Sequence, residues 1–121
     1  MGNRSKALGY TYEVAVKDFF ADLFAAVKRN GNQYGPNDRG DIDGVPGWTL
    51  QLKNTAEDKW GTWFEATATQ AVNNETRWWA VIRKMRGKNV KDSLFVMPLW
   101  KAKEMIAHMN QLENQLKEKT V

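Results

Sequence analysis

The sequence contains no cysteine and only one histidine, His108. Disulfide bonds and thiolate zinc sites are therefore excluded, and a single histidine cannot by itself build a histidine-rich metal site or a histidine-based triad. Any bound metal ion must be held by oxygen ligands. The sequence also lacks a run of 18 consecutive apolar residues and an apolar segment at its start, so we expect a cytoplasmic protein without a membrane span or a signal peptide.

What the sequence does contain is enough for one folded domain. Its 121 residues are 42% hydrophobic, which suits a single core. We expect one domain over residues 1–121, with a basic arm at residues 1–8 and a frayed tail at residues 118–121. The net charge of +4 favours a polyanionic partner, although each basic cluster taken singly is equally well explained as a solvated surface.

Apolar residues at helical spacing predict three helices. They are expected over Gly9–Arg29, over Ala56–Asn73 and over about Trp100–Lys117. The apolar stripes of these helices consist, in order, of Val16, Phe19, Phe20, Leu23, Phe24 and Val27; of Trp60, Trp63, Phe64, Ala68 and Val72; and of Ile106, Met109, Leu112 and Leu116.

Four strands are expected between the helices. A hairpin of Asp41–Gly44 and Trp48–Asn54 follows an exposed, turn-rich loop over residues 30–40, and two buried strands follow at Arg77–Met85 and Ser93–Leu99. The order of helices and strands predicts an α/β fold, in which helices flank both faces of a four-stranded mixed β-sheet.

Polar side chains interrupt the hairpin where a buried strand would be apolar. In its second strand Leu50 and Leu52 point to one face, and Gln51 and Lys53 point together to the other, because side chains alternate along a strand. A lysine that points inward requires an explanation. Whether Asp41 lies on the same face depends on the register of the hairpin, since a slip of one residue reverses every side chain.

The length of the turn determines this register. A two-residue Pro46-Gly47 turn would separate Asp41 from Gln51, but proline followed by glycine suits a type II turn, which splays a hairpin. A three-residue loop with Gly47 in the left-handed conformation pairs Asp41 with Gln51. The same loop pairs Ile42 with Leu50 and Asp43 with Thr49. A longer loop or a bulge of the same parity is equally acceptable, so the prediction concerns the parity and not the turn type.

With this parity, Asp41, Asp43, Gln51 and Lys53 share one face of the hairpin. Carboxylate and amide oxygens beside a lysine suit Mg²⁺, and hydrolysis of a phosphodiester needs such an ion together with a nearby cation. The alternative is a surface hairpin with a lysine–aspartate ion pair. Glu13 lies three and seven residues before Val16 and Phe20, beside the buried stripe of the first helix, although an acid in a first helical turn is also stabilised by the helix dipole.

Taken together, Glu13 on the first helix, Gly40-Asp41 at a strand start and Gln51-Leu52-Lys53 on the next strand resemble the PD-(D/E)XK nucleases. Their order and spacing are most similar to those of archaeal and phage Holliday junction resolvases. The basic residues Arg4 and Lys6, and a glycine four residues before Glu13, also match that pattern. The matching motifs cover about the first half of the chain, and beyond Asn54 only the order of the elements agrees.

The resemblance implies a restriction-endonuclease-like core that resolves four-way junctions by Mg²⁺-dependent hydrolysis of two opposed strands, with Mn²⁺ able to substitute. Glu13, Asp41 and Gln51 would hold the metal, with the backbone carbonyl of Leu52 as a further ligand, and Lys53 would serve the attacking water. Gln70 matches the place of an accessory glutamine in some of these nucleases, although a glutamine on the helix surface is the favoured reading of this residue.

The sequence departs from the family pattern at two positions. Gly40 stands where the signature proline precedes the aspartate, and Gln51 stands where an acid is usual. The site therefore offers two carboxylates rather than three unless Asp43 contributes. Glutamine still provides a neutral oxygen, and magnesium sites often use one or two carboxylates together with water and substrate phosphate.

The resemblance further implies a two-fold dimer that acts on branched DNA during recombination or repair, in the host cytoplasm if the protein is encoded by a phage. Four tryptophans could supply core or interface: Trp60, Trp63, Trp78 and Trp79. Contacts to DNA phosphates are expected from Arg4, Lys6, Arg39, Arg83, Lys84, Arg86 and Lys88. Two alternatives remain: a nuclease of the same fold for flaps, ends or nicked duplex, and a DNA-binding module whose site has decayed.

Overall fold

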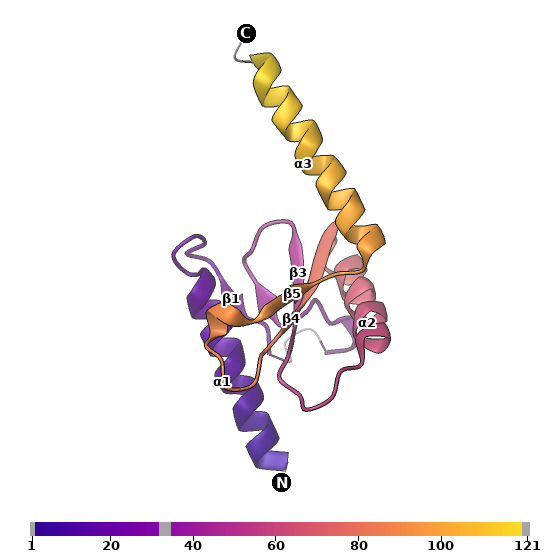
Figure 1. Ribbon diagram of the computed structural model, residues 1–121. Coiled ribbons are helices and arrows are strands. Elements are labelled where there is room, and N and C mark those ends of the chain that lie inside the picture. The colour runs from indigo at the N-terminus through magenta and orange to yellow at the C-terminus, as the bar shows by residue number, and fades with distance from the viewer. Residues whose placement is uncertain (1, 32–34, 120–121) are drawn as a thin grey trace.

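The computed structural model describes residues 2–31 and 35–119, with side chains from residue 7 onward. Figure 1 shows two helices on either side of a central sheet and a third helix that extends away from it. The elements in chain order are α1 (Gly2–Phe20), β1 (Lys28–Arg29), the short 3₁₀ helix η1 (Gly35–Asn37), β2 (Ile42–Asp43), β3 (Trp48–Lys53), α2 (Trp60–Asn73), β4 (Trp78–Arg83), the 3₁₀ helix η2 (Val90–Asp92), β5 (Leu94–Val96) and α3 (Leu99–Lys119).

The strands form one mixed sheet in the order β1-β2-β3-β4-β5. β3 and β4 run parallel, and the other neighbouring strands are antiparallel. A parallel pair cannot be joined by a tight turn, and α2 provides the crossover between these two strands. The α/β class and all four predicted strands are therefore confirmed, but the sheet has five strands because β1 was not predicted.

The first helix differs most from its prediction. It begins at Gly2 instead of Gly9, so residues expected to form a basic arm are helical, and it ends at Phe20 instead of Arg29. Beyond this end, Lys28 and Arg29 pair with β2. A Cβ atom added to Gly44, just after β2, would lie 2.4 Å from the carbonyl oxygen of Ala26. The backbone around Ala26 therefore lies directly against the hairpin, which leaves no room for a helix about 10 Å wide.

The two faces of the sheet bury different residues. On one face, Leu50 and Leu52 of β3 join a core cluster with Tyr12 and Val16 of α1. On the other face lies α2, whose buried side chains include Trp63 and Gln70. Because side chains alternate along β3, the residues between the two leucines point toward α2. The functional face expected from the sequence is therefore the one that α2 covers.

Several surface predictions also need correction. The second helix begins at Trp60 instead of Ala56, and Val72 is 76% exposed because the buried side of α2 passes through Thr67, Gln70 and Ala71 instead. The strand β5 is short, and its Leu94 and Phe95 are exposed, since this edge has no helix over it.

The loop over residues 30–40 is not exposed throughout. Asn30 and Gly40 are buried, and the side-chain amide of Asn30 donates a hydrogen bond to the Gly40 carbonyl at 3.0 Å.

Among the residues that the structure describes, no helix combines the length and the apolar character needed to cross a membrane.

Candidate active site

The β2–β3 hairpin has the predicted parity. Ile42 pairs with Leu50, and both side chains are only 1% exposed. Gly47 has a φ of +81°, the left-handed conformation that a three-residue turn requires. Gln51 and Lys53 consequently lie on the opposite face of β3 from the two leucines, as predicted.

Asp41 is anchored to β3 by both its backbone and its side chain. Its amide donates to the Leu50 carbonyl at 2.8 Å, and its Oδ2 accepts a hydrogen bond from the Leu52 amide at 2.8 Å. Burial raises the pKa of Asp41 to about 6, and the hydrogen bond from Leu52 opposes this shift. The charges of Glu13 and Asp38 raise the same pKa further, whereas Lys53 lowers it, so these groups belong to one electrostatic neighbourhood.

The turn before Asp41 requires glycine at position 40. Its φ of +89° is open to glycine, whereas the proline ring holds φ near about −65°. A Cβ atom at Gly40 would also lie 2.9 Å from the Leu50 carbonyl oxygen. The chain therefore reaches Asp41 through a backbone conformation that proline cannot adopt.

Gln51 and Lys53 present polar atoms to the space beneath α2. The Oε1 atom of Gln51 is buried and has no hydrogen-bond partner among the described residues. Lys53 is partly buried, and its Nζ lies 5.6 Å from the centre of the Trp63 ring. A buried oxygen without a donor is uncommon in folded proteins, and it marks a position where an ion or water can bind.

Asp38 is a site residue that the sequence analysis missed. Its Oδ1 accepts from the Gly40 amide at 2.9 Å, an arrangement typical of an aspartate two residues before a glycine in a turn. Its Oδ2 accepts from the Nε2 of Gln70 at 3.0 Å, and its carbonyl accepts from Asn73. Asp38 thereby connects the loop before β2 to the buried side of α2.

Gln70 is 8% exposed, which excludes the surface reading of this residue. While its Nε2 binds Asp38, its Oε1 is buried and has no hydrogen-bond partner among the described residues. Gln70 and Gln51 therefore each keep a buried amide oxygen unsatisfied, one on α2 and one on the strand that α2 covers. Amide and carboxylate oxygens are the kinds of donor that a hard cation takes.

Glu13 is engaged by a residue of the unpredicted strand. The guanidinium of Arg29 on β1 donates to the Oε2 of Glu13 at 2.5 and 2.9 Å, and it stacks 4.2 Å from the centre of the Tyr10 ring. The pair is partly buried. Glu13 still contributes to the electrostatic environment of Asp41, and a metal ion bound there would share its carboxylate with Arg29.

The remaining predicted ligands are less well placed. Asp43 lies on β2 opposite Lys28, and it is not among the charges that shift the pKa of Asp41. The backbone of Leu52 contacts Asp41 through its amide. Within residues 2–31 and 35–119, no three acidic or histidine side chains converge closely enough to form a metal site.

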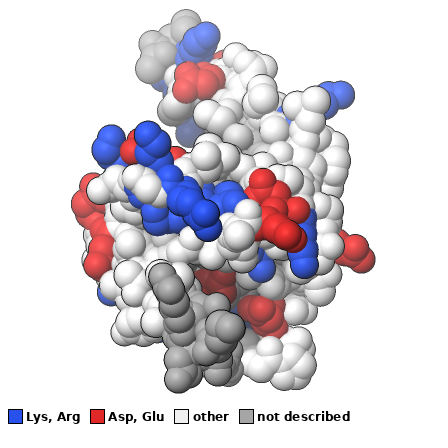
Figure 2. Space-filling model, turned by 60° about the horizontal axis from the view of Figure 1, so that its bottom comes forward, with Lys and Arg blue, Asp and Glu red and all other residues white. Residues whose placement is uncertain are grey.

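A broad groove lies next to Lys53. Its volume is about 980 Å³, and it runs along the ends of β3 and β4 and the start of α1. The basic residues in its lining are Lys53, Arg83, Lys84 and Arg86. Asp58 binds the guanidinium of Arg83 at 2.7 Å, so this residue is partly neutralised. The face in Figure 2, which turns the bottom of the molecule forward, carries a band of lysine and arginine with acidic residues beside it.

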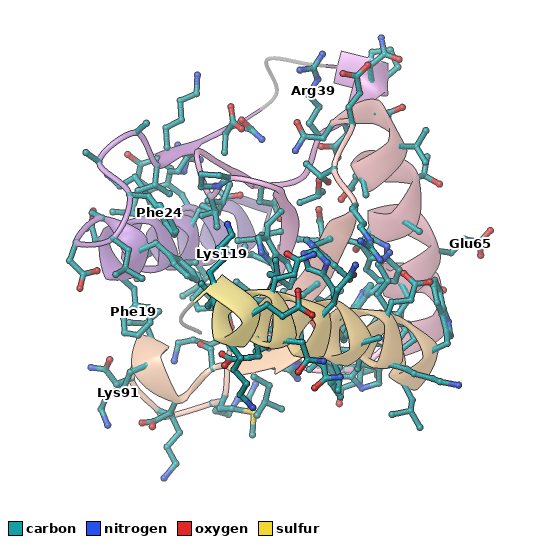
Figure 3. All side chains as sticks on the ribbon, turned by 90° about the horizontal axis from the view of Figure 1, so that it is seen from above. Phe19, Phe24, Arg39, Glu65, Lys91 and Lys119 are labelled. Carbon is teal, nitrogen blue, oxygen red and sulfur yellow. The ribbon has the colours of Figure 1, made fainter. Side chains whose placement is uncertain are left out.

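The residues predicted to contact DNA come from several elements of the chain. Three of them, Arg83, Lys84 and Arg86, line the groove, and Lys88 follows in the same exposed loop. In Figure 3, Arg39 lies beside η1 and α2, on the opposite side of the molecule from Lys91. The side chains of Arg4 and Lys6 lie outside the part of the chain described here.

The site combines a buried carboxyl group at Asp41, buried amide oxygens at Gln51 and Gln70, and a lysine on the same face of β3 beside a basic groove. These are the components that hydrolysis of a phosphate ester requires. Comparison of the chain with protein-family models, curated proteins and solved structures finds no match.

Proposed function

We propose that this chain is a metal-dependent endonuclease that hydrolyses phosphodiester bonds in branched DNA, with the four-way Holliday junction as its substrate. The observation that carries the proposal is the group around Asp41. Asp41 carries a buried carboxyl group with a raised pKa, Gln51 on the neighbouring strand keeps a buried oxygen unsatisfied, and Lys53 occupies the same face of β3 as Gln51. The order of α1, the β2–β3 hairpin, α2 and β4 also fits the proposed restriction-endonuclease-like core.

The donor atoms around Asp41 are of the kind that a magnesium ion takes, namely carboxylate and amide oxygens. Asp41 and Gln51 would hold it, and Glu13 and Asp38 are the further carboxylates whose charge reaches Asp41. When bound, Mg²⁺ or Mn²⁺ would supply the positive charge that activates a water molecule and neutralises the phosphate. Asp38 offers the second acid that Gln51 does not supply, and it fits this role better than Asp43, which lies beside Lys28.

The other residues of the site would bind the DNA substrate and position the attacking water. Lys53 would orient the attacking water and offset negative charge on the phosphate, since its ammonium lies on the ligand face of β3. The groove lined by Lys53, Lys84 and Arg86 would hold the sugar–phosphate backbone through charge, without reading the base sequence. Binding that does not depend on base sequence suits a substrate that is recognised by its branched shape.

A second candidate function is supported by a specific observation. Arg29 binds the Oε2 atom of Glu13, and both carboxylate oxygens of Asp38 already accept hydrogen bonds. Gln51 carries no charge, so the site offers few charged oxygens to a cation. If these ligands do not bind a metal ion, the chain is a DNA-binding module that binds DNA in the same groove and does not cleave it.

The deciding experiment is cleavage of a labelled four-way junction, compared with matched duplex and flap substrates, in Mg²⁺, Mn²⁺ or EDTA. We expect paired symmetric cuts in the junction that disappear in EDTA and in the variant Asp41→Asn. The matched control is Asp22→Asn, which makes the same chemical change at an exposed turn position and should cut like the wild type. Lys53→Met should slow cleavage by roughly a hundredfold or more while metal binding persists.

Each other result has a defined meaning. Metal-dependent cutting of flaps or duplex in preference to junctions keeps the nuclease and rejects the junction as its substrate. Tight binding of the junction without cleavage in either metal supports the second candidate. Cleavage that survives Asp41→Asn rejects the proposed site.

A further inference from the structure

Arg29 lies beside the candidate site, and the proposed chemistry gives it no role. It belongs to β1, which pairs with β2 and lies next to α1 in Figure 1. The backbone of this segment reaches Asp41 directly, because the Asn30 amide donates to the Asp41 carbonyl at 2.9 Å. Arg29 pairs across the two strands with the core residue Ile42, so its side chain points to the face of the sheet that α1 covers.

The contact between Arg29 and Glu13 uses only one oxygen of the carboxylate. The Nε and Nη2 atoms of the guanidinium both donate to Oε2, at 2.9 and 2.5 Å. An arginine and a carboxylate frequently pair through two parallel hydrogen bonds, which engage both oxygens. Here Oε1 takes no part in the contact, so the contact with Arg29 does not prevent a second cation from binding Oε1 of Glu13.

The surroundings of Arg29 hold its charge in this position. The guanidinium lies 4.2 Å from the centre of the ring of Tyr10, which precedes Glu13 by three residues on α1. The side chains of Arg29 and Glu13 are 28% and 21% exposed, so water and salt screen their charges less than at an open surface. A guanidinium also stays charged at any physiological pH. The charge of Glu13 is therefore offset in the metal-free protein.

The charge of Glu13 acts at Asp41, where it raises the pKa of the carboxyl group. A divalent cation bound by Asp41 would be attracted by the same negative charge. Arg29 offsets this attraction, and it also repels a second cation directly. The metal ion and Arg29 are therefore two cations that draw on a single carboxylate.

We propose that Arg29 is an internal competitor of the metal ion, which holds Glu13 in the metal-free protein and lowers the affinity of the site for a divalent cation. The inference rests on the proposed function only in that it takes the metal ion to bind at Asp41 and Glu13. It requires neither DNA nor cleavage, so the binding of the ion alone tests it.

The test is binding of Mn²⁺ to the whole protein without DNA, measured by electron paramagnetic resonance of the free ion. Arg29→Gln removes the competing charge and keeps a donor for Glu13, so it should bind Mn²⁺ roughly tenfold more tightly than the wild type. Arg29→Lys keeps the charge and should bind like the wild type. The matched control is Arg77→Gln, which removes an exposed arginine that stacks on Trp78 at 4.4 Å and should leave the affinity unchanged.

Urea denaturation in EDTA and in Mg²⁺ gives a second measurement and shows that each variant is folded. In EDTA, Arg29→Gln should be less stable than the wild type, because the partly buried charge of Glu13 loses its partner. The same concentration of Mg²⁺ should stabilise Arg29→Gln more than the wild type, since the gain from a bound ligand rises as its dissociation constant falls.

The possible results separate this inference from the proposed function. Equal or weaker binding of Mn²⁺ by Arg29→Gln overturns the inference, and so does binding by Arg29→Lys that is as tight as that of Arg29→Gln. Tighter binding by Arg29→Gln, with a wild type that does not cut DNA, supports the inference and rejects the nuclease. If neither the wild type nor Arg29→Gln binds Mn²⁺, the metal site and the competition are both rejected.

Discussion

Asp41 carries the most perturbed carboxyl group of the candidate site, and its environment makes folding depend on pH. Because burial raises its pKa from 3.8 to about 6, the unfolded chain loses this proton at a lower pH than the folded protein does. The stability associated with the neutral form is therefore fully present below about pH 4 and is lost as the pH rises through 6. The shift corresponds to about 3 kcal/mol at most.

The variant Asp41→Asn removes this titration and keeps an oxygen for the Leu52 amide. In the absence of metal we expect it to match the wild type near pH 4 and to be more stable by up to about 3 kcal/mol at pH 8. Urea denaturation at pH 4, 6 and 8 measures the difference. Asp22→Asn should show no such trend, and parallel profiles for wild type and Asp41→Asn would contradict the assigned environment.

Two glycines offer a matched test of the turn before Asp41. Gly40→Ala places a Cβ atom against the Leu50 carbonyl at a positive φ, so we expect a loss of about 1 to 3 kcal/mol. Gly61→Ala lies in α2, where a Cβ meets no atom within 4 Å, and should gain up to about 1 kcal/mol. Equal effects in urea denaturation would mean that Gly40 is not under conformational constraint.

At the scale of elements, the sequence predicted those parts of the site that are close along the chain. The alternation of Leu50, Gln51, Leu52 and Lys53, together with the turn length, was sufficient to place the polar side chains on one face. Asp38 and Gln70 were not joined in the prediction because their contact spans 32 residues. A pattern of neighbouring residues in the sequence does not predict which side chain of a helix will contact a distant loop.

The end of α1 shows a different limit. Apolar residues continue at helical spacing past Phe20, so the pattern alone predicts a longer helix. Tertiary contacts end the helix earlier, since Val27 packs in the core from the irregular segment before β1 and Arg29 enters the sheet to bind Glu13. The sequence therefore failed to predict both β1 and the ion pair between Arg29 and Glu13 for the same reason. In this segment, tertiary contacts override the local preference for a helix.

The groove between the ends of β3 and β4 predicts how salt affects DNA binding. Lys84→Gln/Arg86→Gln should weaken binding to junction, flap and duplex alike and reduce the slope of log K against log salt by about 1 for each lost phosphate contact. The control is Lys28→Gln/Lys103→Gln, which removes two exposed lysines away from the groove. Filter binding from 50 to 300 mM salt measures both slopes, and equal slopes would remove the groove from the interface.

Considered as a whole molecule, the protein is built around one parallel pair of strands. β3 and β4 lie side by side from Trp48 and Trp78 to Lys53 and Arg83, so both strands deliver their last residues to the same edge of the sheet. The segment between them contains all of α2 and with it Gln70 and Trp63. The candidate site therefore combines a hairpin with a crossover helix that must return to cover it.

This arrangement has a consequence for how the protein folds. The contact between Asp41 and Leu52 closes a loop of 11 residues, whereas the contact between Asp38 and Gln70 closes one of 32. Because the entropy lost on closing a loop rises with its length, the hairpin half of the site forms at a lower entropic cost than the half that α2 completes. A folding intermediate with β2 and β3 paired and α2 undocked would hold Asp41 in place while Gln51 and Lys53 still faced water.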